Sequence, residues 1–196
     1  MGKIFYVMGK SASGKDTIYK KLLEKFPQLK RVIPYTTRPI RDGELEGEEY
    51  YFTVEKMLDE YRRAHKIIEE RTYQTVYGPW SYFAVDDGQI DLKGNMGYLM
   101  IGTLESYEKT RSYYGEEHLV PIYVEVEDGD RLLRAVERER TQKVPKYKEL
   151  CRRFLADEED FKEENLKSCG IERRFYNNDL EGCIKEIAEY VGKSLS

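Results

Sequence analysis

The residues most able to do chemistry lie near the start of the chain, in the stretch GKSASGKDT at positions 9–17. Its glycines and its second lysine have the spacing G-x-x-x-x-G-K. In a loop of this kind, backbone N–H groups surround a phosphate group, and the lysine reaches toward the transferable end of a nucleotide. The alternative is a chance glycine-rich turn. The residues predicted to bind the nucleotide are Gly9, Lys10, Ser11, Ala12, Ser13, Gly14, Lys15, Asp16 and Thr17.

The segments on either side of this loop favour the phosphate site over a chance turn. Residues 4–8 form an apolar run rich in aromatic and β-branched side chains, which is typical of a buried strand. Ile18, Leu22 and Phe26 recur at four-residue spacing, which predicts one face of a helix. A helix that starts at the loop adds its partial positive charge and its free N–H groups. The order of strand, loop and helix therefore predicts a P-loop.

Composition excludes several other classes of protein. The chain has 196 residues, of which 36% are charged, and a net charge of −4, so we expect one well-solvated globular domain that does not bind nucleic acid. No apolar run approaches the ~20 residues that span a bilayer. Because the predicted first strand starts close to residue 1, we expect no signal peptide. These features predict a cytoplasmic protein with no membrane partner. Cys151, Cys169 and Cys183 are then expected to be free thiols.

A second candidate site follows at residues 36–44. Arg38 and Arg41 are three residues apart among turn-forming residues, and arginine offers planar, paired N–H donors that suit a dianionic phosphate. The same two side chains could instead be exposed and bridge to nearby carboxylates, namely those of Asp42, Glu44 and Glu46. Spacing alone does not decide between these two interpretations.

A longer pattern around these arginines is similar to a known family. Residues 36–50 read T-T-R-x-x-R-x-G-E-x-x-G-x-x-Y and lie downstream of the P-loop. This stretch resembles the monophosphate-binding segment of guanylate kinases. Further similarities are Glu69 after two isoleucines, Tyr77 followed by glycine, and the sequence Asn-Asp-Leu at residues 178–180. The resemblance extends over essentially the whole chain and is most specific at residues 36–50.

The resemblance implies roles for several residues on the acceptor side. Arg38, Arg41, Tyr50 and Tyr77 would hold the phosphate of the acceptor monophosphate. Glu69 would read the base, because a carboxylate can accept two parallel hydrogen bonds from the N1–H and the exocyclic amine of guanine. The alternative for Glu69 is one more charge in an exposed polar run.

The sequence departs from the family pattern where the base would bind. The family's base-contacting serine falls on Pro34, which has neither a hydroxyl group nor an N–H donor. The small hydroxyl residue after Tyr-Gly falls on Pro79, which is followed by the bulky Trp80. The missing guanine contacts would have to be rebuilt, and Tyr35, Trp80 and Ser81 are the nearby candidates. The pattern therefore indicates monophosphate binding and leaves the base open.

Arginines also crowd residues 130–140, which precede a predicted helix break at residues 141–145. The resemblance places lid arginines at Arg134 and Arg138, with Arg153 on the helix that returns. Positive charge is needed there because phosphoryl transfer spreads negative charge over the moving group. We expect the break to form the mobile tip of the lid.

Two other arginines in this stretch have a structural interpretation. Oppositely charged side chains one helical turn apart stabilise an exposed helix. We expect Arg131 and Arg140 to lie on such a helix and to form salt bridges with Glu137 and Glu139. They are therefore left out of the predicted catalytic residues, which are Lys15, Arg134, Arg138 and Arg153.

The predicted metal ligands rest on a second departure. A serine or threonine normally ligates magnesium after the P-loop lysine, and here that position holds Asp16, followed by Thr17. In guanylate kinases the strand predicted at residues 98–101 ends in two acidic residues, and those positions are Met100 and Gly102 here. A carboxylate missing at the strand end is thus present in the loop, and magnesium accepts hard oxygen ligands of either kind. We expect Asp16 and Thr17 to hold Mg²⁺ beside ATP.

Strands that alternate with helices around a P-loop predict an α/β fold, with a P-loop NTPase-type parallel sheet and helices on both faces. We expect a single guanylate-kinase-like domain over residues 1–196. Its core would comprise residues 1–33, 91–135 and 151–196, with an inserted monophosphate-binding segment at 34–90 and a lid at 136–150.

The leading prediction is a nucleoside monophosphate kinase that transfers the γ-phosphoryl group of ATP to a monophosphate, first of all GMP. ATP and Mg²⁺ are the expected cofactors, nucleotides are the expected partners, and the chain would be a monomer or a homodimer. Two alternatives stay open. One is a non-catalytic binding module, which the residues at positions 34, 100 and 102 favour. The other is a kinase of the same fold with a different phosphorylated acceptor.

Overall fold

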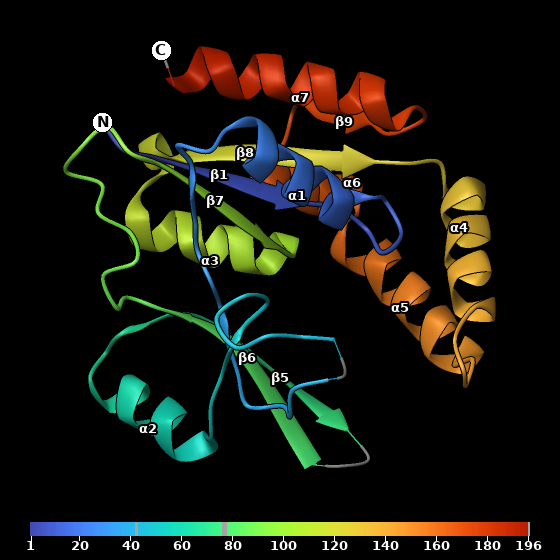
Figure 1. Ribbon diagram of the computed structural model, residues 1–196, viewed down its shortest axis with the longest axis horizontal. Helices are drawn as coiled ribbons and strands as arrows, with labels where there is room; N and C mark the ends of the chain where they lie inside the picture. The colour runs from blue at the N-terminus through green and yellow to red at the C-terminus, as the bar shows by residue number, and fades with distance from the viewer. Residues whose placement is uncertain (42, 76–77, 196) are drawn as a thin grey trace.

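The computed structural model describes residues 1–41, 43–75 and 78–195 of the chain (Figure 1). Its centre is a sheet formed by β1 (Lys3–Met8), β2 (Lys30–Arg31), β7 (Gly97–Gly102), β8 (Leu119–Glu125) and β9 (Arg174–Tyr176). The strand order is β2-β7-β1-β8-β9, and every pairing is parallel. This arrangement confirms the predicted parallel sheet, and it brings the carboxyl ends of the strands to one edge, where ligands bind in such folds.

Helices cover both faces of this sheet, as predicted, and they are α1 (Lys15–Lys25), α3 (Leu104–Tyr114), α6 (Glu163–Ser168) and α7 (Leu180–Leu195). Alternate side chains of β1 point to opposite faces. Val7 packs on one face with Ile18 of α1 and Ile187 of α7. Tyr6 packs on the other face with Leu104 of α3. Burial on both faces explains why β1 is an uninterrupted apolar run.

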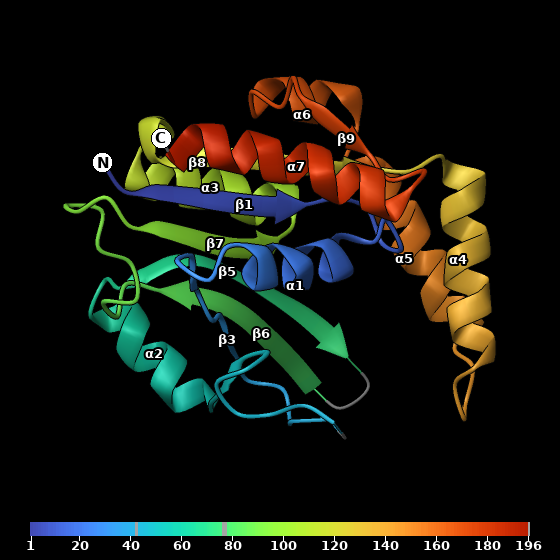
Figure 2. The same ribbon diagram turned by 45° about the horizontal axis from the view of Figure 1, so that its top comes forward.

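A second, smaller sheet lies beneath the main one (Figure 2) and contains β3 (Tyr35–Thr36), β4 (Tyr51–Phe52), β5 (Ile67–Thr75) and β6 (Gly78–Val85). The strand order is β4-β3-β6-β5, and β5 and β6 pair antiparallel. Helix α2 (Glu55–Arg63) covers it through Leu58, which packs on Phe83 and Val85. The antiparallel sheet was not predicted from the sequence.

Two further helices, α4 (Asp128–Arg140) and α5 (Tyr147–Asp160), lie beyond the carboxyl end of β8 (Figure 1). The predicted helix break at residues 141–145 lies between them, and a short 3-10 helix (Glu116–His118) precedes β8. Within the described ranges, no helix has both the length and the hydrophobicity needed to cross a bilayer. The three cysteines are free thiols. The division into core, acceptor segment and lid stays a prediction.

Candidate active site

The glycine-rich loop joins β1 to α1 and has no room for side chains at its two glycines. A Cβ atom at Gly14 would lie 2.3 Å from the Asn177 side-chain nitrogen, and one at Gly9 would lie 2.4 Å from the Val124 carbonyl oxygen. Gly14 also has a φ of +86°, which favours glycine. Asn177 fixes the loop by donating from Nδ2 to the Ser13 carbonyl oxygen at 2.8 Å. The loop backbone is therefore held in a conformation in which no side chain covers it at these two glycines.

Polar groups inside the loop are available to a ligand. Lys15 is the first residue of α1, and in the described part of the chain its ammonium group has no hydrogen-bond or ion-pair partner. Ser13 is buried, and its hydroxyl group has no hydrogen-bond partner among the described residues. An orphaned buried hydroxyl and an unpaired lysine at a helix N-terminus fit an anionic ligand such as a nucleotide phosphate.

Arg38 is held inside the acceptor segment by one carboxylate. Its side chain is only 3% exposed, and it donates from two nitrogens to the two oxygens of Glu44 at 2.7 and 2.6 Å. The guanidinium lies 5.1 Å from the centre of the Tyr50 ring and 5.4 Å from that of Phe52. Glu44 also accepts a hydrogen bond from the backbone N–H of Arg41 at 2.9 Å. The pair is therefore a buried, preformed clamp.

Neither interpretation of the arginine pair was complete. Arg38 does bridge to Glu44, as the structural alternative expected, but it is buried rather than exposed. Arg41 is exposed, and its side chain has no ion pair in the described ranges. The hydrogen bond from Arg38 lowers the pKa of the Glu44 carboxyl group, so the pair is charged at neutral pH. Asp42 and the predicted phosphate ligand Tyr77 lie outside the described residues.

Glu69 is buried, with 5% of its surface exposed, so the alternative of an exposed polar run is wrong for this residue. Burial raises the pKa of its carboxyl group, against the opposing charge of Arg71. Arg71 donates from Nε to Glu69 at 3.2 Å and from a terminal nitrogen to the Thr103 hydroxyl at 2.9 Å. Sequence analysis missed Arg71, although its two-residue spacing from Glu69 on a strand places both side chains on the same face.

An electrostatic interaction links the first turn of α1 to the acceptor segment. Burial and the neighbouring Tyr82 raise the pKa of Tyr50, and the charge of Asp16 adds to the shift. Asp16 is an exposed residue in the first turn of α1, whereas Tyr50 covers Arg38 in the acceptor segment. The charge of Asp16 therefore acts on a residue of the predicted acceptor site.

The predicted lid arginines surround the outer side of the loop. Arg134 donates to the Asn177 carbonyl oxygen at 2.9 Å, so Asn177 contacts both the loop and α4. Arg138 and Arg153 line a small cavity between α4 and α5, and Ser11 of the P-loop lines it as well. The Nε atom of Arg153 is buried without a hydrogen-bond partner among the described residues. Arg138 and Arg153 thus lie close together, Arg134 lies one turn before Arg138 on α4, and the catalytic role of all three stays a prediction.

Comparisons with known proteins agree with these features. Residues 1–86 match the family model for guanylate kinase. The guanylate kinase of Nostoc sp. is 34% identical over 76 residues, which are 39% of this chain and 38% of that protein. That of Rhodopseudomonas palustris is 37% identical over 68 residues, which are 35% of this chain and 31% of that protein.

The first part of the chain is therefore similar to guanylate kinases. The sequence match spans 38% of the length of the Nostoc relative, and it is confined to the first part of the chain. Similarity of structure extends further. The crystal structure of guanylate kinase from Anaplasma phagocytophilum aligns with a TM-score of 0.69 over 99% of this chain and 86% of that chain, at 19% identity. This second comparison shows that the fold is shared.

One departure from the guanylate kinase pattern has a steric cause. A Cβ atom at Gly102 would lie 2.3 Å from the Tyr6 hydroxyl oxygen and 2.7 Å from Ser106 Oγ. Tyr6 is fully buried beneath the strand end and donates to Ser106 Oγ at 2.9 Å. The buried tyrosine thus occupies the space next to the position where the family has an acidic residue. Met100 is likewise buried, at 6% exposure.

The residues predicted to hold magnesium fit that role by their chemistry. Asp16 and Thr17 are exposed neighbours at the start of α1, and neither has a side-chain partner in the described ranges. Mg²⁺ is commonly held by one or two carboxylates together with substrate phosphates. Among the described residues, no cluster of three or more His, Cys, Asp or Glu side chains is placed to hold a metal by itself. A magnesium ion here would therefore depend on the nucleotide phosphates.

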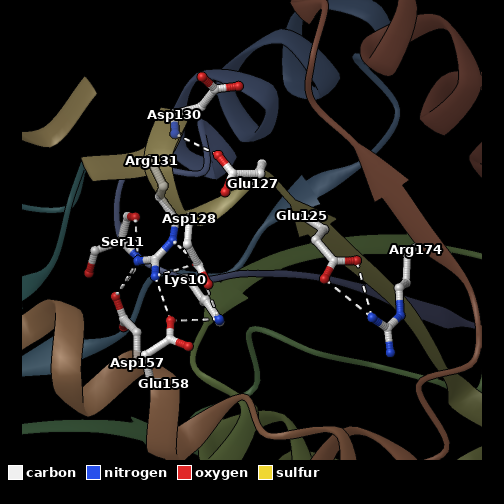
Figure 3. A network of polar contacts seen from close by, with 10 residues as sticks. All are labelled: Lys10, Ser11, Glu125, Glu127, Asp128, Asp130, Arg131, Asp157, Glu158 and Arg174. Carbon is white, nitrogen blue, oxygen red and sulfur yellow. Dashed lines mark hydrogen bonds and ion pairs between the residues drawn. The ribbon is translucent and has the colours of Figure 1, made fainter. Parts of the chain in front are cut away.

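The prediction for Arg131 was wrong. Its side chain is 1% exposed and pairs with Asp128 at 2.8 Å, Glu158 at 2.7 Å and Asp157 at 3.3 Å, not with Glu137 or Glu139 (Figure 3). Sequence analysis missed these partners because two of them come from α5, which is distant along the chain. Arg140 is exposed, as expected, although it makes no ion pair in the described part of the chain.

This lid-base cluster, which comprises Lys10, Asp128, Arg131, Asp157 and Glu158, joins the P-loop to both lid helices. Lys10 pairs with Glu158 at 2.7 Å and with Asp128 at 3.4 Å. The backbone N–H of Ser11 donates to Asp157 at 2.7 Å (Figure 3). Burial opposes the ionisation of Asp128, but Arg131 and Lys10 outweigh it and lower the pKa of its carboxyl group. The cluster therefore fixes the bases of α4 and α5 against the loop.

Proposed function

We propose that the protein is an ATP-dependent nucleoside monophosphate kinase that transfers the γ-phosphoryl group of ATP to a monophosphate. GMP is the leading candidate for this acceptor. The observation that carries the proposal is a lysine without a polar partner among the described residues in the P-loop, together with a buried arginine in the acceptor segment, and these two cations would face each other across one cleft. On one side, Lys15 has no hydrogen-bond or ion-pair partner among the described residues and stands at the N-terminus of α1, where ATP would bind. On the other, Arg38 is held beside Tyr50, where an acceptor phosphate would bind.

In this mechanism, an oxygen of the acceptor phosphate attacks the γ-phosphorus of ATP, and the bond between that phosphorus and the β–γ bridging oxygen breaks. ADP leaves, and the acceptor becomes a diphosphate. The attacking oxygen is already anionic, so no general base is required. Lys15 and the loop N–H groups would hold the ATP phosphates, and Arg134, Arg138 and Arg153 would stabilise the charge that spreads over the transferring group. Arg38, Arg41, Tyr50 and Tyr77 would orient the acceptor.

Magnesium, when bound, neutralises charge on the ATP phosphates. Asp16 and Thr17 would hold it. Helices α4 and α5 would close over the donor site and exclude water, which otherwise competes with the acceptor for the γ-phosphoryl group.

The experiment that tests the proposal is an acceptor panel. The purified chain is incubated with Mg-ATP and each of the ribonucleoside and deoxyribonucleoside monophosphates, and diphosphate products are separated by ion-exchange chromatography. We expect at least one diphosphate to accumulate with stoichiometric ADP. Absence of every diphosphate product would reject the kinase.

A second candidate function is a non-catalytic binding module, and the buried Tyr6 beside Gly102 favours it because a strand-end acid cannot return there. A protein that binds but does not transfer would still be stabilised by its nucleotide, since a ligand that binds only the folded state raises the melting temperature. Stabilisation by Mg-ATP without any product on the acceptor panel would support this second function. No stabilisation by ATP would reject the kinase and leave a module that binds a partner without using the nucleotide site.

A further inference from the structure

The acceptor side contains a donor that can replace the one lost at Pro34. Glu69 and Arg71 lie two residues apart on β5, and their side chains share a face of the second sheet. Arg71 is anchored from two directions, by Glu69 at 3.2 Å and by the Thr103 hydroxyl at the N-cap of α3 at 2.9 Å. Its guanidinium is therefore held beside the carboxylate that would read the base.

Two of the three residues first considered as replacements are engaged elsewhere. The Tyr35 hydroxyl donates to Asp87 at 2.7 Å, and its ring stacks on Phe83 under α2. Ser81 is 1% exposed, and its hydroxyl is hydrogen-bonded to Thr72 at 2.8 Å. Neither side chain is free to meet a base beside Glu69.

Arg71 has unused capacity for hydrogen bonding. A guanidinium has five N–H donors, and the two contacts above use two of them. The side chain is 17% exposed, so part of the group is accessible to a ligand. The third candidate, Trp80, lies opposite Tyr73 on the same face of the sheet, so its indole N–H is the competing donor to be tested.

We propose that Glu69 and Arg71 together read an amide edge, in which a ring N–H lies next to a carbonyl oxygen. Glu69 accepts a hydrogen bond from the ring N–H, and Arg71 donates one to the carbonyl oxygen. Pro34 has no donor for this second hydrogen bond. Guanine and hypoxanthine present this edge. Adenine presents the reverse arrangement, so its ring nitrogen would face the carboxylate and its amine would face the guanidinium. The inference rests on the proposed function, because it assumes that an acceptor base lies against Glu69.

The arrangement of Glu69 and Arg71 also predicts that the 2-amino group of guanine contributes little to binding affinity. One oxygen of Glu69 already accepts from Arg71, so a single oxygen stays fully available to the base. Hypoxanthine lacks only the 2-amino group. We therefore expect IMP to bind within about tenfold of GMP, since one additional hydrogen bond contributes a modest net free energy.

The test is calorimetric binding of GMP, IMP and AMP to the full chain and to three variants. We expect the wild type to bind GMP and IMP at least about 100-fold more tightly than AMP, because a site built for one edge leaves its buried groups unpaired with the other. Arg71→Met should lose about that factor for GMP and IMP while AMP changes less than about threefold, and Arg71→Lys should recover part of the loss. Trp80→Phe should leave all three affinities nearly unchanged.

Several results would overturn the inference. Equal losses for all three ligands in Arg71→Met would assign Arg71 to the phosphate or to folding, and loss of GMP binding in Trp80→Phe would make the indole the donor. If Arg71→Met does not fold, Arg71→Lys alone must still narrow the GMP to AMP ratio. A wild type that transfers phosphate but shows no preference for GMP over AMP would reject this inference and leave the proposed function standing. A wild type that binds no monophosphate would reject both.

Discussion

The two predicted phosphate sites hold their cations in opposite ways. At the predicted acceptor site, Arg38 is buried, paired with both oxygens of Glu44 and covered by aromatic rings. At the predicted donor site, Lys15 has no hydrogen-bond or ion-pair partner within the described ranges and stands at the N-terminus of α1. Under the proposed function, the acceptor clamp is formed before its ligand binds, whereas the P-loop lysine gains its partner only when the ATP phosphates bind.

The largest expected effect comes from removing the ammonium group of Lys15. Lys15→Met should lower the rate of phosphoryl transfer about 1,000-fold, because one preorganised donor to a developing charge typically contributes that much. Its melting temperature should stay within ~2 °C of the wild type, because the side chain has no hydrogen bond or ion pair among the described residues that unfolding would break.

Initial rates and thermal melts of the same preparations give both quantities. The matched control is Lys20→Met, an exposed lysine on the same helix, which should leave the rate unchanged. A Lys15→Met protein that is as active as this control would show that Lys15 does not act on the ATP phosphates.

A smaller effect is expected at the lid base, where the cation is already paired. Arg131→Met should lower the free energy of unfolding by about 3 kcal/mol, because removing one partner of a buried cluster leaves its carboxylates uncompensated. Urea unfolding at neutral pH measures this change.

Arg152 provides a control on the neighbouring helix, since it is 58% exposed and, among the residues that the structure describes, its ion-pair partner is Glu149 alone. Arg152→Met should cost less than about 1 kcal/mol. Equal costs for the two variants would show that burial of Arg131 does not increase the contribution of its ion pairs.

The acceptor clamp has a signature in pH. The Arg38 contact lowers the pKa of Glu44 from its ordinary value of 4.5, so its stabilisation is present above that value and is lost as the pH falls through the lower, folded-state pKa. Glu44→Gln should be less stable than the wild type by about 1 kcal/mol at pH 7, and the difference should shrink toward zero near pH 3. Chemical unfolding of both proteins across this range tests the sign. A difference that grows on acidification would contradict the assignment.

The smallest expected effect concerns the metal. Without magnesium, the Asp16 carboxylate would repel the ATP phosphates, and with magnesium it would help to hold them. Removal of Mg²⁺ should therefore weaken ATP binding to the wild type about fivefold more than it weakens binding to Asp16→Ser. Titrations of ATP with and without Mg²⁺, on both proteins, measure this ratio. Equal magnesium dependence would rule out a metal role for Asp16.

The sequence was sufficient for the parts of the molecule that local patterns encode. The apolar run at β1, the glycine spacing of the loop and the periodicity of α1 all predicted what the structure shows. Strand β5 was missed because its polar sequence, IIEERTYQT, lacks the apolar signal of a buried strand. Its regularity comes instead from pairing with β6 along almost its whole length.

The missed site residues share a different cause. Arg131, Asn177 and Arg71 acquire their roles through partners that are distant along the chain: α5 for Arg131, the P-loop for Asn177, and the N-cap of α3 for Arg71. Spacing within one element cannot reveal such contacts. For Arg131 it pointed instead to glutamates on its own helix, and burial against α5 overrode that local preference.

The measurement that bears most directly on the central claim is transfer of label from γ-32P-labelled ATP in the presence of magnesium and GMP. If the two phosphate sites act across one cleft, the label should appear in GDP, at least about tenfold faster than in inorganic phosphate, because closure excludes water from the donor site. GDP labelled in this way would show direct transfer between the two sides. Label that appears only in inorganic phosphate, or that stays in ATP with GMP and with every other monophosphate, would contradict the account.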